Sequence, residues 1–261
     1  MRIRVTAAAV TICGALTLSV LAVPGAQAAG GPTITKVVVN GGKNIVVSPT
    51  TATNFTATVT ASDPSGVIET GLTLWYGSGS YNDAKGWIAS SGERKCIASS
   101  STTTTCTIPF QVIANPRALV NEVTNSLAGT WHVSASAFSR NRVQTVNESF
   151  TTVKVQRASQ LTVNATPEPV KKDATITVTG KLSRANWDTH KYAGYASQPV
   201  KLQFRAKSSG TYTTVKTITT SSAGTLSTTV KAMADGYYRY SFAGTSTTPA
   251  ANATGDFVDV Q

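Results

Sequence analysis

The cysteines are the most informative of the few residues in this chain that could do chemistry. Of three, Cys13 lies within an apolar leader, which leaves Cys96 and Cys106. A redox pair would place its cysteines two residues apart, and a zinc site needs more ligands than two thiols and two distant histidines. We therefore predict a structural disulfide between Cys96 and Cys106, held in an oxidising compartment.

Catalytic side chains are sparse. His132 lies on an alternating segment that points it to solvent, and His190 lies in a long loop beside an aspartate. Asp83 and Glu93 are the one carboxylate pair to consider for glycoside hydrolysis. Asp63 brings only one acid to a calcium site that would need several. No nucleophile elbow, zinc-protease helix or phosphate-binding loop is present, so we expect no catalytic residue, no metal and no cofactor.

Aromatic residues in two long loops are the best candidates for binding. Exposed rings would give flat apolar platforms for sugar rings or a protein partner. The alternative is that each loop folds back and uses its rings to cover its own core. Trp75 and Trp131 lie on alternating segments, which predicts packing roles. The candidate binding residues are Tyr81 and Trp87 in the first loop (77–92), and Trp187, Tyr192 and Tyr195 in the second (185–195).

The first 28 residues have the pattern of a secretory signal peptide. A cationic start precedes an apolar run from Val5 to Val23, and Ala26 and Ala28 form a small-residue cleavage site. We expect cleavage after Ala28 and release to the cell exterior. No later apolar run reaches the roughly 18 residues that a membrane span needs.

The chain is basic, with 23 Lys and Arg against 12 Asp and Glu. Loss of Arg2 and Arg4 with the leader would leave 21 against 12. This charge would keep a solvated surface soluble; the alternative is that it draws the chain to anionic wall polymers, acidic polysaccharide or lipid head groups, through a field that salt screens within roughly 10 Å. We do not expect nucleic acid as a partner, because the compartment is wrong and the cations are dispersed along the sequence. No feature specifies an oligomeric state.

Period-2 alternation predicts an all-β first domain over residues 29–157. Phe55, Ala57, Val59 and Ala61 alternate with threonines, as in a strand with one buried face. The cysteines would staple a hairpin whose tip spans 99–105. Asn115 followed by proline offers an N-cap, which predicts a short helix through Ala118, Leu119 and Val123.

The second domain, residues 158–261, shows seven short strand-like segments separated by turn residues, which is typical of an immunoglobulin-like sandwich. Residues 161–260 resemble the bacterial immunoglobulin-like modules of secreted actinobacterial proteins. The resemblance lies in residues 198–205 (Gln-Pro-Val-Lys-Leu-Gln-Phe-Arg), 212–216 (Tyr-Thr-Thr-Val-Lys) and 235–239 (Asp-Gly-Tyr-Tyr-Arg), where Tyr238 resembles a tyrosine corner. Such modules act as spacers, stalks or binding units.

The sequence thus predicts two tandem immunoglobulin-like β-sandwich domains after a cleaved signal peptide. The function we expect is that of a secreted, non-enzymatic binding or structural module, which contacts cell-wall glycan or another protein through its aromatic loops. The alternative is an extracellular hydrolase with an accessory sandwich domain. A third possibility is an inhibitor that presents the disulfide-braced tip, although that tip lacks a large or charged anchor residue.

Overall fold

A computed structural model describes residues 30–117 and 119–261 of the chain. The predicted signal peptide and Cys13 lie outside these residues. Residues 31–261 form one compact unit. Within the described residues there is no helix with the length and apolar character needed to cross a bilayer.

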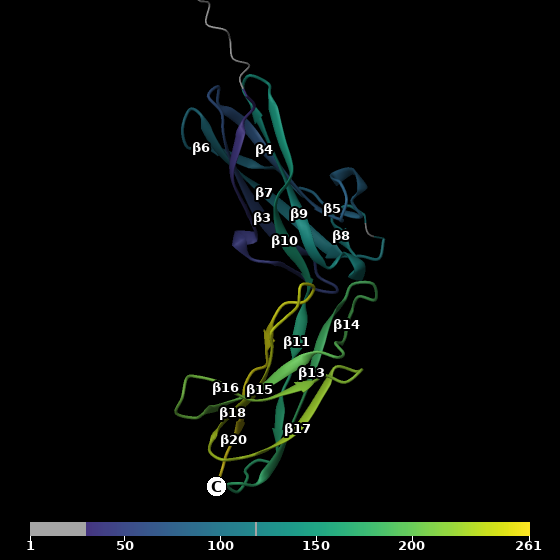
Figure 1. Ribbon diagram of the computed structural model, residues 1–261, viewed down its shortest axis with the longest axis vertical. Coiled ribbons are helices and arrows are strands. Elements are labelled where there is room, and N and C mark those ends of the chain that lie inside the picture. The colour runs from purple at the N-terminus through teal and green to yellow at the C-terminus, as the bar shows by residue number, and fades with distance from the viewer. Residues whose placement is uncertain (1–29, 118) are drawn as a thin grey trace, which may run out of the picture. The chain divides into compact units, whose positions relative to one another are not determined.

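The first sandwich consists of two five-stranded sheets (Figure 1). The first sheet contains β1 (Thr33–Val39), β3 (Thr53–Ser62), β7 (Thr103–Ala114) and β6 (Lys95–Ala98) in that order, with β8 (Glu122–Val123) beside β7. The second contains β2 (Ile45–Val47), β10 (Gln144–Arg157), β9 (Gly129–Ser139), β4 (Val67–Tyr76) and β5 (Gly86–Ile88) in that order. Pairing is antiparallel except where β2 joins β10 and β8 joins β7.

The alternation of apolar and polar residues along the strands explains how the first sandwich forms its core. On β3, Phe55, Ala57 and Val59 are buried while the threonines between them are not, as the sequence predicts. The core adds Leu72, Leu74, Trp131 and others from the facing sheet. The turn after β3 closes where Asp63 accepts hydrogen bonds from the amide and hydroxyl of Ser65, and Gly66 takes the left-handed φ of +93° that suits glycine.

The helix expected after Asn115 is wrong. The described residues there form a turn and then β8. The Asn115 side chain accepts a hydrogen bond from the Arg117 amide, and the Glu122 carboxylate accepts one from the Leu119 amide. A helix N-cap would also make the contact with Arg117, but the Leu119 amide, which a helix would pair with the Asn115 carbonyl oxygen, donates to Glu122 instead. The buried Val123 pairs as a strand.

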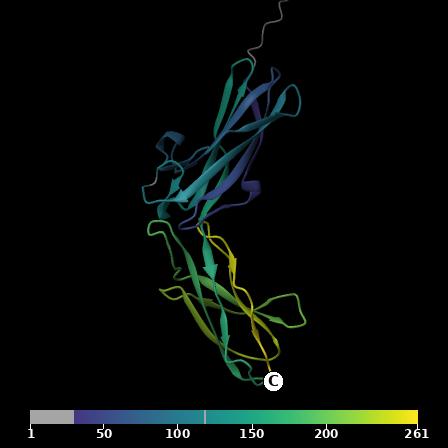
Figure 2. The ribbon, with the colours of Figure 1, turned by 180° about the vertical axis from the view of Figure 1, so that it is seen from behind.

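The second sandwich consists of two further five-stranded sheets. In one, β13 (Thr175–Asn186) is central, between β11 (Ser159–Leu161) with β12 (Asn164–Thr166) on one side and β17 (Thr225–Lys231) with β14 (Lys191–Gly194) on the other. In the other, the order is β16 (Thr213–Thr219), β15 (Pro199–Ala206), β18 (Gly236–Phe242), and then β19 (Ala251–Asn252) and β20 (Asp256–Val258). Figures 1 and 2 show β17 beside β13.

The core of this sandwich follows the predicted alternation. Val200 and Leu202 on β15, and Tyr238, Tyr240 and Phe242 on β18, all point inward. The Tyr238 hydroxyl lies 3.5 Å from the Lys231 carbonyl oxygen, the kind of contact that a tyrosine corner makes. The all-β fold class with immunoglobulin-like sandwiches is therefore confirmed. The division between residues 157 and 158 stays a prediction, although the two pairs of sheets do lie on either side of it.

Candidate functional site

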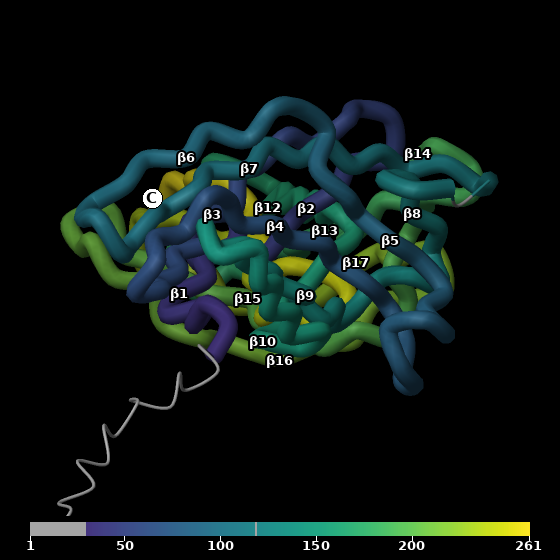
Figure 3. Tube along the Cα trace, turned by 90° about the horizontal axis from the view of Figure 1, so that it is seen from above, coloured from purple at the N-terminus to yellow at the C-terminus, as the bar shows by residue number. Residues whose placement is uncertain are grey.

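The predicted disulfide is present. Cys96 on β6 and Cys106 on β7 are bonded and stand directly opposite one another, with their Cα atoms 3.9 Å apart. Cys106 is buried, and its Sγ accepts a hydrogen bond from the Thr70 amide at 3.3 Å. The bond joins neighbouring strands of one sheet, whereas antibody domains use their disulfide to join two sheets. It fixes the hairpin between β6 and β7, which lie side by side in Figure 3.

The aromatic segment of the second sandwich is not a loop. Residues 183–186 pair with residues 191–194, so β13 and β14 form a hairpin with a turn at 187–190. Trp187 is 0% exposed and packs into the core of the first sandwich. Its indole Nε1 donates to the Val47 carbonyl oxygen at 3.1 Å, and its amide donates to Asn125 Oδ1 at 2.9 Å. The sequence left open whether this segment exposes its rings or folds back over a core, and Trp187 is buried in the core of the first sandwich.

Polar side chains explain why the Trp187 hairpin turns inward. The Asn125 side chain donates to Asn186 Oδ1 at 2.8 Å and to Asp188 Oδ2 at 2.6 Å, and the Asn125 amide donates to Asp188 Oδ1. Arg157 Nε donates to the Ala185 carbonyl oxygen at 2.6 Å. Burial and the neighbouring charge of Arg184 lower the pKa of Arg157 to about 10. These contacts hold the hairpin end against the first sandwich.

The other two aromatic residues of this segment differ in exposure. Tyr195 is 9% exposed and packs edge-on against Phe242, with the Arg184 guanidinium 3.9 Å from its ring centroid. Burial raises the pKa of Tyr195, but a hydrogen bond from Thr245 and the charge of Arg184 outweigh it, and the net direction is downward. Tyr195 is thus a packing residue of the second sandwich, which matches the alternative that the segment covers its own core. Tyr192 is 37% exposed and stays a surface candidate.

The aromatic residues of the first sandwich lie on the outer face of a sheet. Leu72 and Leu74 point inward on β4, so Trp75 points outward. Trp75 stands opposite Trp87 on β5 and opposite His132 on β9. Tyr81, in a short 3₁₀ turn at Tyr81–Asp83, packs edge-on over Trp75 with ring centroids 6.1 Å apart. The three strands therefore carry one row of aromatic rings, Trp87, Trp75 and His132.

Trp75 is the fixed centre of this row. It is 3% exposed, its ring stacks on His132 with centroids 4.1 Å apart, and its Nε1 donates to the Glu148 carbonyl oxygen at 2.6 Å. The register of β10 shifts between Asn147 and Thr151, and the residues at that shift reach Trp75 and His132. Ser149 Oγ lies 2.8 Å from His132 Nδ1. These contacts hold the Trp75 and His132 rings in place.

A shallow groove runs beside this row, and we call it the outer groove. It comprises two depressions, of about 190 Å³ and about 390 Å³, which share Leu72, Thr73, Ser136 and Gln144. Tyr81 and Glu148 line the first depression, and the ion-paired Glu69 and Arg94, with N and O atoms 3.3 Å apart, line the second. The remaining lining residues are Ser134 and Val146 in the first, and Gly71, Ala89, Ser90 and Ile108 in the second.

The two depressions of the outer groove lie on different parts of the sheet. The second extends to the edge of β4 before Leu74, because β5 pairs with residues 74–76 alone. The first lies over β4, β9 and β10, where hydroxyl, amide and carboxylate groups converge beside the aromatic ring of Tyr81. This combination can hydrogen-bond the hydroxyl groups of a ligand and pack against its apolar face.

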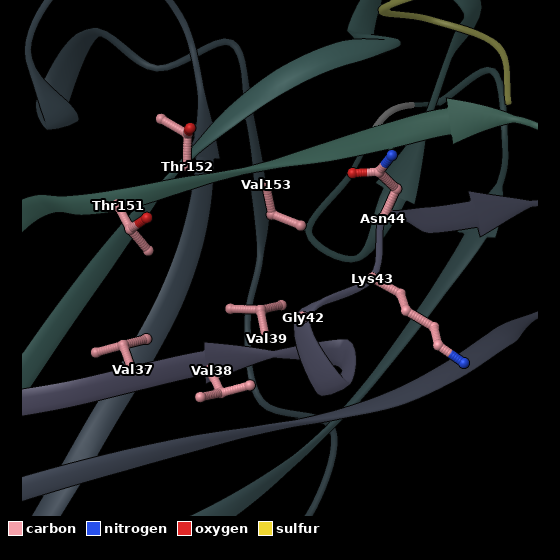
Figure 4. Close-up of a pocket in the computed structure, with 9 residues that line it drawn as sticks. All are labelled: Val37, Val38, Val39, Gly42, Lys43, Asn44, Thr151, Thr152 and Val153. Carbon is pink, nitrogen blue, oxygen red and sulfur yellow. The ribbon is translucent and has the colours of Figure 1, made fainter. Parts of the chain in front are cut away.

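Another depression, of about 250 Å³, lies between β1 and β10 (Figure 4). Val39 on β1 and Val153 on β10 point toward one another, and the Lys43 ammonium group points away from them. Thr151 and Thr152 supply the only hydroxyl groups of its lining. Because so few polar groups converge there, it is a weaker candidate than the outer groove.

The sequence reasoning found Tyr81 and Trp87 but assigned Trp75 to packing and His132 to the surface. Alternation along the strands places Trp75 and His132 on the same face of the sheet. Each is next to a buried core residue of its own strand, Leu74 or Val133, and therefore points to the other face. Asp83 instead accepts a hydrogen bond from the Ser80 hydroxyl at 2.7 Å, and does not line the outer groove. Whether any candidate residue binds a ligand stays a prediction.

Comparison with known families adds little. Residues 42–137 match the profile of a family described as a family of unknown function (DUF5707). The match covers much of the first sandwich and includes β4, β5 and β9 in large part. No curated protein matches the chain.

Several solved structures match the chain at low similarity. Dimeric latent PorU from Porphyromonas gingivalis is 12% identical with a TM-score of 0.28 over 92% of this chain, which spans only 21% of the PorU chain. Fibronectin(III)-like modules of CbhA from Clostridium thermocellum are 11% identical with a TM-score of 0.31, over 86% of this chain and 93% of theirs. The Escherichia coli adhesin FdeC is 12% identical with a TM-score of 0.33, over 88% and 66%. Likenesses at this level carry no functional argument.

Proposed function

We propose that the chain is an extracellular, non-enzymatic binding module that holds a glycan chain in the outer groove. The observation that carries this proposal is that hydroxyl, amide and carboxylate groups of the outer groove surround the ring of Tyr81, which packs edge-on over the buried Trp75. Sugars present both hydroxyl groups and apolar ring faces, so they fit such a lining. The Cys96–Cys106 disulfide and the predicted leader support an extracellular location.

The experiment is a binding measurement with the mature chain. Cell-wall and polysaccharide fractions would be tested for retention, at low and high salt so that generic attraction of the basic chain is excluded. Tyr81→Ala removes the ring over Trp75 and should weaken retention about tenfold, which corresponds to about 1.4 kcal/mol. Tyr192→Ala is the matched control, because it removes an exposed tyrosine from the second sandwich and should leave retention unchanged.

An extracellular hydrolase with an accessory sandwich stays the second candidate, because Glu69 and Glu148 line adjoining parts of one groove. Glu69 is paired with Arg94, which favours a binding role over an acid or base. Incubation of a retained glycan with the protein, followed by measurement of new reducing ends, separates the two functions. Release of reducing ends that Glu148→Gln abolishes would replace the binding proposal with the hydrolase.

A further inference from the structure

A second surface, on the other sandwich, gathers cations and aromatic rings that are far apart in the sequence. On β15 and β18 the core residues Leu202, Tyr238 and Tyr240 point inward, so Arg205 and Arg239 point outward. Arg205 stands opposite Tyr237 on β18, and Arg239 stands opposite Gln203 on β15. The fold thus brings these two arginines, which are far apart in the sequence, onto one face of the sheet.

Aromatic rings fix these two arginines in place. The Arg239 guanidinium lies 3.8 Å from the Tyr212 ring centroid, and the Arg205 guanidinium lies 4.2 Å from that of Tyr237 and 5.3 Å from that of Tyr212. The Tyr237 ring in turn packs on Phe257, with centroids 5.1 Å apart. The Lys207 ammonium lies 5.4 Å from the Phe257 centroid. We call this set the cation–aromatic face.

The charges of Arg205 and Arg239 are not neutralised within the described residues. The ion pairs found there belong to Arg94, Arg117 and Lys207. Arg205 donates one N–H to the Ser209 carbonyl oxygen, and Arg239 donates its Nε–H to Gln203 Oε1. A guanidinium has five N–H donors in a planar fork, so each arginine retains donors for a bidentate anion. Because the stacking already restricts both side chains, an anion bound there would cost less side-chain entropy.

From this arrangement we propose that the cation–aromatic face binds an acidic polysaccharide through its carboxylate groups. Arg205 and Arg239 occupy diagonal cross-strand positions, which lie on the order of 7 Å apart, and the exposed Lys201 extends the line of cations along β15. A polymer with a carboxylate on each sugar can contact several of these groups at once. A single small anion would reach only one.

The covered rings argue for a polysaccharide over other polyanions. Bases of single-stranded nucleic acid need free ring faces for stacking, and here guanidinium groups occupy faces of Tyr212 and Tyr237. A membrane-binding surface needs apolar side chains that enter the lipid, and Phe257 lies half-buried beneath Lys207. A carboxylate needs only the outward N–H edges, which the stacked geometry leaves available.

The test uses the mature chain with polygalacturonate as the acidic probe and dextran as the neutral one, at about 0.01 M and about 0.15 M salt. Arg205→Gln with Arg239→Gln should weaken polygalacturonate binding at least tenfold. The matched control is Lys171→Gln with Lys172→Gln, which removes the same charge from exposed positions of the same sandwich and should change binding less than twofold. Circular dichroism would establish that both variants fold.

A further variant separates geometry from charge. Arg205→Lys with Arg239→Lys keeps the charge but loses the planar fork, and should also weaken binding several-fold. The proposal is overturned if the lysine variant binds like the parent, if the control pair loses as much as the arginine pair, or if the parent prefers phosphatidylglycerol vesicles or single-stranded DNA to polygalacturonate. Because the outer groove lies on the first sandwich, Tyr81→Ala should not affect this binding, and either proposal can fail alone.

Discussion

The two aromatic segments of this chain are alike in sequence, but the fold leaves one at the surface and buries most of the aromatic rings of the other. Residues 81–87 place Tyr81 and Trp87 on the outer side of a sheet, where Tyr81 lines a polar groove. Residues 187–195 form a hairpin end whose Trp187 is buried in the first sandwich and whose Tyr195 is buried in the second. Aromatic content alone therefore does not identify a binding surface. Whether an aromatic ring is exposed depends on which residues the fold packs against it.

The largest expected effect concerns the buried member of this comparison. Trp187→Ala should lower the free energy of unfolding by about 3–5 kcal/mol, because it empties a filled core position and leaves the Val47 carbonyl oxygen without its indole donor. Chemical denaturation followed by circular dichroism measures this. Tyr192→Ala, which lies exposed on the same hairpin, should cost less than about 0.5 kcal/mol. Equal costs for the two variants would show that Trp187 is not a core residue.

The next largest effect is expected when the disulfide of the first sandwich is removed. Cys96→Ser with Cys106→Ser should destabilise the first sandwich by about 2–3 kcal/mol, since the bond closes a short loop in the unfolded chain. The second sandwich has no such bond within the described residues. Hydrogen exchange should therefore report faster opening of β6 and β7 while β15 and β18 retain their protection. Uniformly faster exchange throughout would contradict this assignment.

A smaller effect is expected from the polar contacts that hold the hairpin. Asn125→Ala removes a donor to Asn186 and Asp188 and the acceptor of the Trp187 amide, and should cost about 1–2 kcal/mol. The same denaturation series measures it. Combining this change with Trp187→Ala should cost less than the sum of the two, because both act on one contact. Strict additivity would mean that Asn125 does not hold Trp187 in place.

The smallest effect at neutral pH is expected at Tyr240 in the second sandwich, and it depends on pH. Burial raises the pKa of Tyr240 to about 12 from 10.0, and its hydroxyl donates to the Val178 carbonyl oxygen at 2.8 Å. Below pH 10.0 Tyr240 is neutral in both the folded and the unfolded chain, so its full contribution to the free energy of unfolding is present. Between pH 10.0 and about 12 only the unfolded chain ionises, so the contribution is lost as the pH rises.

Tyr240→Phe isolates this contribution. At neutral pH the variant should be about 1 kcal/mol less stable than the parent, because the hydrogen bond to Val178 is absent. As the pH rises from 10.0 toward about 12 the difference between parent and variant should shrink and then change sign, because a pKa shift of about two units corresponds to about 3 kcal/mol, more than the hydrogen bond contributes. A constant difference across this range would mean that the Tyr240 hydroxyl ionises as easily in the folded chain as in the unfolded one.

Local patterns predicted the strands but not the long-range contacts. Alternation identified β3 and β18 because each buries one face, and the cysteine pair was assigned from compartment and number. The burial of Trp187 depends on Val47 and Asn125, which are distant in the sequence, so no local pattern reveals it. The cation–aromatic face was missed for the same reason, since β15, β18 and β20 bring its members together.

The most direct test of the contrast between the two segments is hydroxyl-radical footprinting of the free mature chain. Trp187 should be oxidised as slowly as the core residue Trp131, while Trp87 and Tyr192 react faster because they are at least partly exposed. Mass spectrometry of the peptides resolves each site. If Trp187 instead reacts as fast as Trp87, the hairpin is free in solution, and the second segment regains its place as a candidate binding surface.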